Sequence, residues 1–254
     1  MIPFERREKI LALLKKEKFC KISYLSKRLN ASYMTVHRML NELEREGLVK
    51  KVHGGVRLNE STSAKIMFEL RMNVNLPQKR EIAKKAIDFI EEDDIIFLDS
   101  STTCYVLAKE LSARDINNIT LVTTSPFIIH ELSDCINMNI ISTGGQLDTR
   151  TKGFVGPLAI NTLDQVHIST AFISSGAISV EQGIKSSFPF IVEIRKRVIE
   201  KANKVIFIGD NSKFHNNSLL TIAPLSKIDL IITDSQLDQK ILNYFLEKGI
   251  KIIN

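Results

Sequence analysis

Residues 32–47 read SYMTVHRMLNELEREG, and this stretch predicts a helix that begins after Ser32 and ends before Gly47. Serine is a favoured N-cap, and glycine commonly follows the last helical residue. The apolar side chains form one narrow stripe on such a helix, and they are Val36, Met39, Leu40 and Leu43. Because an apolar stripe has to be buried, we expect this helix to pack on the segments that precede it.

The opposite face of this helix carries hydrogen-bond donors and cations but no carboxylate. Its residues are Met34, Arg38, Asn41 and Arg45, with Thr35 and His37 on the flanks. A helix of about 13 residues is roughly 20 Å long, enough to lie in the major groove of DNA. There, Arg38 is suited to guanine and Asn41 to adenine. An ordinary helical hairpin with a charged face is the alternative interpretation of this segment.

Two shorter helices are predicted before it. The first covers residues 6–16, and the second begins at Ser23, which we expect to be its N-cap. Leu25 and Leu29 lie four residues apart on the second helix, and residues 30–32 form a tight turn. Helix, turn and helix in this order predict a helix-turn-helix.

A basic hairpin follows, with the sequence LVKKVHGGVRL at residues 48–58. Alternating apolar residues flank Gly54–Gly55, the expected two-residue loop. The polar residues around the tip are Lys50, Lys51, His53 and Arg57. A β-wing of this kind places cations beside DNA phosphates, so the whole segment predicts a winged helix-turn-helix.

The positive charge of the chain is concentrated in this segment. Residues 1–58 hold fourteen Lys and Arg against six Asp and Glu, a net charge of +8, whereas the remaining residues hold 21 against 23, a net charge of −2. Such a distribution is typical of a nucleic-acid-binding module joined to a near-neutral body. The predicted DNA-binding residues are Arg6, Ser32, Tyr33, Met34, Thr35, His37, Arg38, Asn41, Lys50, Lys51, His53 and Arg57.

The rest of the chain alternates strand-like and helix-like segments. After a polar linker at residues 59–76, the predicted strands are short β-branched runs at 94–98, 118–124, 138–143, 167–174, 203–210, 228–234 and 250–254. Alternation of this type predicts an α/β domain at residues 77–254 with a mostly parallel sheet. The winged module occupies residues 1–58.

Polar residues follow four of these strands. Open α/β sheets bind ligands at the carboxyl ends of their strands, and hydroxyls at a helix N-terminus suit a phosphate or carboxylate. Helix capping is the simpler explanation of any one loop, but four such loops on one edge of one sheet favour an anion-binding cleft. The candidate effector-binding residues are Asp99, Ser100, Ser101, Thr102, Thr103, Thr124, Ser125, Gly144, Gly145, Asp210 and Lys213.

Several classes of site and location are excluded by composition. The three cysteines and five histidines are scattered without metal-ligand spacing, so we expect no metal and no cofactor. No apolar run is long enough to span a bilayer, and the first residues lack the apolar region of a signal peptide. Free cysteines suit a reducing compartment, so a cytoplasmic location is expected.

The first 58 residues also resemble the DNA-binding domain of the DeoR family of bacterial transcriptional regulators. The matching residues are Glu5–Arg6–Arg7, Ile10, the stretch from Thr35 to Leu40, Leu43–Glu44, Gly47 and the stretch from Val52 to Val56. His37 and Met39 depart from the usual arginine and acidic residue of the family. The resemblance implies binding to operator DNA as a homo-oligomer, a dimer or tetramer, most often in repression of carbohydrate metabolism.

The second part is similar to DeoR-type sensor domains, whose fold is similar to ribose-5-phosphate isomerase and which bind phosphorylated sugars. The matching residues are Phe68, Arg71, Lys79, Asp99 to Thr103, Thr124–Ser125, Gly144–Gly145, Gly156–Pro157, Ala171 to Ile173, Gly183, Glu193, Asp210 and Ser212 to Phe214. Ser101 replaces a glycine of the family pattern, and Thr124 an asparagine. The resemblance implies that Ser101, Thr102 and Thr103 hold the phosphate, with Lys213 and Gly145 nearby.

Two other functional classes fit the sequence less well. A sugar-phosphate isomerase with a DNA-binding tail would need a carboxylate base. Isomerase relatives place this residue after the strand that corresponds to 167–174, but no Asp or Glu occurs there before Glu181. A DNA-architectural protein would not need a sheet-edge cleft. A ligand-responsive transcriptional regulator, not an enzyme, is therefore the favoured interpretation.

Overall fold

A computed structural model describes residues 6, 9–11, 13–14, 17–45, 48–58, 68, 71–114 and 116–254. Gly47, the expected stop of the third helix, lies outside them. The chain divides into two compact units, Met1–Val74 and Asn75–Asn254. None of the helices in the described part has the length and apolar character needed to cross a bilayer.

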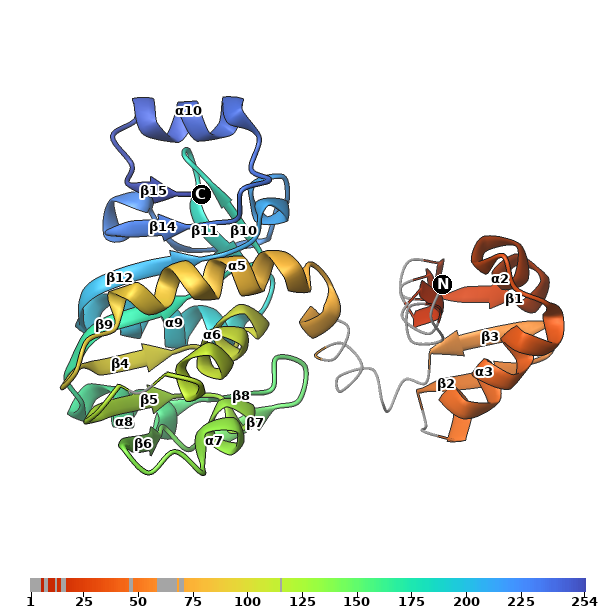
Figure 1. The fold of residues 1–254 in the computed structure, drawn as a ribbon, viewed down its shortest axis with the longest axis horizontal. Helices are drawn as coiled ribbons and strands as arrows, with labels where there is room; N and C mark the ends of the chain where they lie inside the picture. The colour runs from red at the N-terminus through yellow and green to blue at the C-terminus, as the bar shows by residue number, and fades with distance from the viewer. Residues whose placement is uncertain are drawn as a thin grey trace. The chain divides into compact units, whose positions relative to one another are not determined.

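In the described part of the first unit, residues 6, 9–11, 13–14 and 17 are helical, and they precede helices at 22–29 and 33–45 and a three-stranded antiparallel sheet (Figure 1). The elements are β1 (Phe19–Lys21), α2 (Ile22–Leu29), α3 (Tyr33–Arg45), β2 (Val49–Val52) and β3 (Gly55–Leu58), with strand order β1-β3-β2. Leu25, Val36, Leu40 and Leu43 have no exposed surface. The predicted apolar stripe of α3 is therefore the core of a winged helix-turn-helix.

Local details of this unit both confirm and correct the sequence predictions. The Thr35 N–H donates to Ser32 Oγ at 3.2 Å, which confirms Ser32 as the cap of α3. The expectation that Ser23 caps α2 is wrong, because β1 runs directly into the helix and Lys21 takes the cap position. The hairpin loop is also shifted by one residue: Val52 pairs with Gly55, so His53 and Gly54 form the turn. Gly54 has a φ of +79°, a conformation that favours glycine.

The second unit is built on a seven-stranded parallel sheet with the order β15-β14-β12-β9-β4-β5-β6. Its strands are β4 (Ile95–Leu98), β5 (Ile119–Thr123), β6 (Met138–Ser142), β9 (Ile168–Ile173), β12 (Ala202–Ile208), β14 (Leu230–Ile232) and β15 (Ile252–Ile253). Six of them lie within the predicted runs and β12 begins one residue before its run, which confirms the α/β class. Phe97, Phe172 and Phe207 are fully buried on the three central strands.

Helices cover both faces of this sheet, as Figure 1 shows. The helices α5 (Leu76–Ala86), α6 (Thr102–Ser112) and α7 (Pro126–Leu132) lie side by side on one face, and α8 (Pro157–Gln165) and α9 (Pro189–Lys201) lie on the other. The helix after β4 is α6, which leads to β5, and the next helix after β9 is α9, which leads to β12. The sheet therefore changes its winding direction between the neighbouring strands β4 and β9, which is where open α/β sheets form a crevice.

Smaller elements surround this framework. The hairpin of β7 (Gln146–Asp148) and β8 (Gly153–Val155) and the antiparallel sheet of β10 (Ala177–Ser179), β11 (Gly183–Ser186) and β13 (Leu220–Ala223) were not expected from the sequence. Helix α10 (Gln239–Glu247) precedes β15, and three 3₁₀ turns cover Ile87–Phe89, Asn211–Phe214 and Leu225–Lys227. The new strands are only three or four residues long, too short for a clear period-2 pattern.

Candidate DNA-binding surface and effector site

Helix α3 carries the predicted base-contacting residues Met34, Arg38 and Asn41, flanked by Thr35 and His37, on one face, called the reading face below. Met34 is 75% exposed and Tyr33 is 53% exposed. Arg38 is also exposed, whereas Thr35, His37 and Asn41 are half-buried. The Tyr33 and His37 rings lie 6.2 Å apart. One face of α3 thus combines an arginine, an amide, an imidazole and two large apolar side chains, all suited to base edges and to the thymine methyl group.

A cleft of about 360 Å³ opens beside this face, between the start of α2, the start of α3 and the wing. The side chains that line it include Lys21, Ser23, Tyr33, His37 and Lys51. Two lysines around an open cleft make this part of the surface attractive to anions. Lys21 and Ser23 were not among the predicted DNA-binding residues, because their position depends on the unexpected strand β1.

The basic residues of the wing differ in environment. Lys50 and Arg57 are exposed and lie directly opposite each other on β2 and β3. Lys51 faces α3, where it contacts Glu44 and Asn41. His53 is exposed in the turn, and Arg6, in the first predicted helix, is half-buried. The structure therefore separates the two neighbouring lysines that the sequence placed together.

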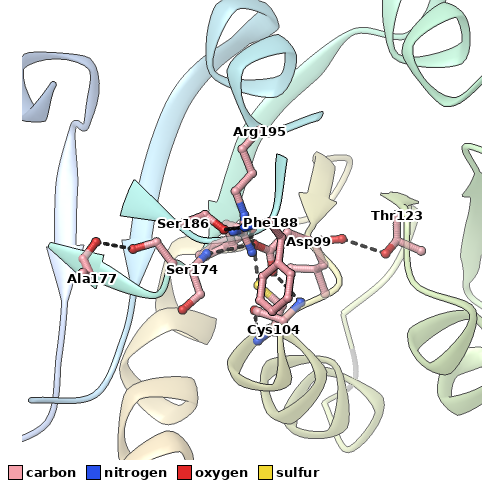
Figure 2. Close-up of polar contacts among 12 residues, drawn as sticks. Asp99, Cys104, Thr123, Ser174, Ala177, Ser186, Phe188 and Arg195 are labelled. Carbon is pink, nitrogen blue, oxygen red and sulfur yellow. Dashed lines mark hydrogen bonds and ion pairs between the residues drawn. The ribbon is translucent and has the colours of Figure 1, made fainter. Parts of the chain in front are cut away.

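In the second unit, Asp99 connects the carboxyl ends of neighbouring strands through its side chain. Its carboxylate is 2% exposed and accepts hydrogen bonds from the Ser101 N–H at 2.8 Å and the Ser174 N–H at 2.9 Å. Arg195 of α9 donates from Nε at 2.9 Å and lies 2.8 Å away through Nη2. Figure 2 shows Arg195, Ser174 and Asp99 converging. Asp99 thus joins the end of β4 to the end of β9 and to α9, across the change of winding direction.

The loop after β4 forms the start of α6. Ser101 caps this helix by accepting from the Cys104 N–H at 3.1 Å, and the first turn carries no acidic residue. Ser100, Thr102 and Thr103 are buried beside it. Burial raises the pKa of the Cys104 thiol well above its usual value, so it stays neutral. The loop offers hydroxyls and a helix N-terminus, the features that suit a phosphate.

The neighbouring loop after β5 is closed by the β7–β8 hairpin. Ser125 caps α7 by accepting from the Ile128 N–H at 3.3 Å, and the Phe154 N–H donates to the Thr124 carbonyl at 2.7 Å. The Thr124 hydroxyl itself is buried without a hydrogen-bond partner, as are Oγ1 of Thr151 and Oδ2 of Asp148 in the hairpin. A buried polar group left unpaired costs about 1–3 kcal/mol. These three atoms therefore lack the hydrogen bonds that buried polar groups normally make.

The last two predicted loops flank this centre. Gly144 and Gly145 follow β6, and both have positive φ, of +61° and +103°. At the other side, Asp210 follows β12 and accepts from Asn75 Nδ2 at 2.9 Å and from the Ser212 N–H at 3.1 Å. Lys213 lies 3.6 Å from Asp210. Burial acts to raise the pKa of Asp210, but Lys213, Ser212 and Asn75 outweigh it and leave this pKa below its usual range.

The parallel sheet therefore brings all the predicted loops to one edge. Two residues of this site were not predicted from the sequence. Ser174 could have been, because it ends the predicted strand at 167–174, whereas Arg195 belongs to no recognisable motif. Gly153, where a Cβ would collide with Ser100, was not predicted either. No group of three or more His, Cys, Asp or Glu side chains in the described ranges is arranged to hold a metal ion.

Two family models match the chain. One, described as the DeoR-like helix-turn-helix domain, covers residues 6–62. The other, described as the DeoR C terminal sensor domain, covers residues 74–235, more than half of the sequence. The chain belongs to the DeoR family.

Curated relatives agree with this membership along almost the whole chain. The HTH-type transcriptional regulator IolR of Bacillus subtilis is 36% identical over 223 residues, 88% of each chain. The L-fucose operon activator of Haemophilus influenzae is 31% identical and covers 94% of this chain and 95% of its own. The transcriptional repressor AccR of Agrobacterium fabrum is 32% identical, with coverages of 91% and 89%.

Solved structures align less well. A ribose-5-phosphate isomerase in complex with phospho-erythronic acid covers 54% of this chain and 52% of its own, with 22% identity and a TM-score of 0.40. That score is too low to bear on the ligand of the DeoR-family chain. The DeoR family consists of DNA-binding transcriptional regulators, so the prediction that this chain is a regulator rather than an isomerase is confirmed.

Proposed function

We propose that this DeoR-family regulator represses carbohydrate-metabolism genes as a homo-oligomer, and that a phosphorylated sugar controls its affinity for operator DNA. Operator binding involves the twelve residues predicted from the sequence, on α3, its cap, the wing and the first helix. Winged modules usually bind repeated half-sites as dimers, which supports a dimer or tetramer. Three free cysteines are consistent with action in the cytoplasm.

The position of Asp99 is the observation that best supports the proposed location of the effector site. It binds the ends of β4 and β9 at the point where the sheet changes direction. Ligands of open α/β sheets lie at such points. The phosphate is placed at the N-terminus of α6, with Ser101, Thr102 and Thr103, because this helix start is electropositive and carries no acidic residue.

The size of a sugar phosphate limits which of the predicted residues bind it together. Neighbouring strands lie about 4.8 Å apart, and β12 and β6 are separated by the three strands β9, β4 and β5. The loops carrying Lys213 and Gly145 are thus about 19 Å apart along the sheet edge. We place the ligand over β9, β4 and β5, with Lys213 reaching in from one side and Gly145 shaping the loop on the other.

The carbon chain of the sugar then extends from α6 toward β5 and the β7–β8 hairpin. The unpaired atoms there are two hydroxyls, of Thr124 and Thr151, and a carboxylate oxygen of Asp148. Sugar hydroxyls both donate and accept hydrogen bonds, so they match this set. A ligand that satisfied them would remove the cost of leaving them buried and unpaired.

The test is a titration of the full chain with a panel of phosphorylated sugars and sugar acids, read by thermal shift. A bound ligand raises the melting temperature through linkage. Thr102→Val and Lys213→Met are expected to raise the ligand Kd at least about tenfold, from loss of a hydrogen bond to a charged group. Thr221→Val and Lys240→Met, at exposed positions elsewhere, are the matched controls.

Binding to the chain's own promoter region without a sugar serves as the second readout. The affinity for this DNA is expected to remain unchanged in the two test variants and the two control variants. Unchanged ligand binding in Thr102→Val and Lys213→Met would place the effector elsewhere, and lost DNA binding would assign these residues to folding.

A further inference from the structure

The lysines at positions 50 and 51 are adjacent in the sequence but occupy different environments. Successive residues of a strand point to opposite faces, and Lys50 is exposed beside Arg57. Lys51 is only 30% exposed and points to α3. A single role in phosphate binding therefore does not follow for both residues.

Lys51 binds Glu44 through its backbone and its side chain. The Lys51 N–H donates to Glu44 Oε1 at 2.9 Å, and Lys51 Nζ lies 3.0 Å from Glu44 Oε2. Both oxygens of one carboxylate on α3 are thus used by one residue of the wing. The backbone hydrogen bond and the ammonium of Lys51 hold the pKa of Glu44 below its usual range.

The same ammonium also contacts the reading face of α3. Lys51 Nζ donates to Asn41 Oδ1 at 2.5 Å. Asn41 and Glu44 are three residues apart and so are neighbours on the helix surface, with Glu44 just outside the face that carries Asn41. Lys51 therefore sits between the carboxylate that anchors it and the amide that is expected to face DNA.

We propose that Lys51 is a positioning residue for DNA recognition: anchored by Glu44, it fixes the wing to α3 and holds the Asn41 amide so that its NH₂ group faces the base edges. The inference rests on the DNA binding of the family and on Asn41 being a base contact. Its partner on DNA is a hydrogen-bond acceptor in the major groove.

This orientation changes the base that Asn41 selects. An asparagine that binds adenine with two hydrogen bonds uses Oδ1 to accept from N6 and Nδ2 to donate to N7. In this chain one of the two lone pairs of Oδ1 already accepts from Lys51, so adenine N6 would have to share this oxygen with an ammonium group. The donors that remain suit a base with acceptors only, and guanine, which offers N7 and O6, fits better than adenine.

The experiment is selection of binding sites from a randomised DNA duplex library, using the full chain and its variants. Asn41→Ala identifies the base pair that Asn41 reads. Lys51→Met is expected to lose about tenfold discrimination at that same base pair, and Lys51→Arg, which keeps the donors, is expected to retain it. The selected base in the unmodified chain is expected to be guanine.

Lys50→Met is the matched control, since it removes the neighbouring cation. It is expected to leave the selected sequence unchanged while reducing the slope of log affinity against log salt by about 0.9, the value for one phosphate contact. Lys51→Met is expected to leave that slope unchanged. In the double variant Asn41→Ala/Lys51→Met, no further discrimination should be lost beyond Asn41→Ala alone.

Three results would overturn the proposal. One is a Lys51→Met variant that keeps the selected sequence and reduces the slope of log affinity against log salt as Lys50→Met does, which would make Lys51 a phosphate contact. Another is an additive loss in the double variant, and the third is selection of adenine at the base pair read by Asn41. If Lys51→Met does not fold, Glu44→Ala, which removes both acceptors that anchor Lys51, is measured instead and should show the same loss of discrimination.

Discussion

Replacement of Arg195 by methionine tests the structural centre of the sensor unit. Arg195 and Asp99 form an ion pair whose side chains are 8% and 2% exposed. Methionine keeps much of the length of the side chain but removes both contacts to Asp99 Oδ2. The Asp99 carboxylate would then keep the N–H groups of Ser101 and Ser174 but lose the guanidinium that balances its charge.

The magnitude follows from what Asp99 loses. Two hydrogen bonds to a charged group contribute about 1.5–3 kcal/mol each, and breaking a buried ion pair from one side costs about 3–5 kcal/mol. We expect the free energy of unfolding to fall by about 3–5 kcal/mol. For a unit of this size, that is a drop in melting temperature of about 6–20 °C.

Arg197→Met, on the same helix, is the control. Arg197 pairs with Asp164 and Glu200 at the surface, where its side chain is 38% exposed. An exposed pair contributes about 0–1 kcal/mol, so this variant should melt close to the unmodified chain. Both variants are compared by urea unfolding and by thermal unfolding followed by circular dichroism.

The double variant Asp99→Asn/Arg195→Met completes the test. Neutral asparagine no longer leaves a buried charge, so the double variant is expected to recover part of the stability lost in Arg195→Met. Equal losses in Arg195→Met and Arg197→Met, or a double variant less stable than Arg195→Met, would refute the role assigned to Asp99.

Three further predictions concern single residues. Arg38→Ala should weaken binding to the selected operator by about 1–3 kcal/mol but weaken random-sequence DNA binding far less, as measured by fluorescence anisotropy; equal losses on both would make Arg38 a phosphate contact. Ser32→Ala should lower the free energy of unfolding by about 1 kcal/mol through loss of the α3 cap, and an unchanged urea midpoint would contradict this. Asp210→Asn should lower the free energy of unfolding at pH 7. Because the folded pKa of Asp210 is lowered, the difference in stability between the variant and the unmodified chain should persist down to about pH 4 and shrink on further acidification. Urea unfolding at a series of pH values measures it, and a difference that grows with acidification would contradict the prediction.

The main architecture was predictable because strongly periodic segments leave few choices. The stripe of Val36, Leu40 and Leu43 allowed one buried face for α3, and all three are fully buried. The β-branched runs of the second unit predicted seven strands, and alternation with helices predicted that they are parallel. Parallel pairing then placed the polar loops at one edge without any knowledge of their contacts.

The remaining features depend on contacts between residues distant in the sequence. Strand β1 exists because Phe19 to Lys21 pairs with β3, more than 30 residues away, and this pairing displaced Ser23 from its expected cap. Arg195 shows no pattern of its own, since a basic residue on an amphipathic helix usually faces water. Its burial becomes visible only when α9 is placed on the sheet above Asp99.

The most direct test of the account is the binding of the full chain to a fluorescent duplex from its own promoter region, with and without phosphorylated sugars. We expect salt-dependent binding that exceeds binding to random DNA, and an affinity that one of the sugars changes by about 5- to 150-fold. Promoter binding no tighter than to random DNA at low salt, or tight binding that no phosphorylated sugar alters, would contradict it.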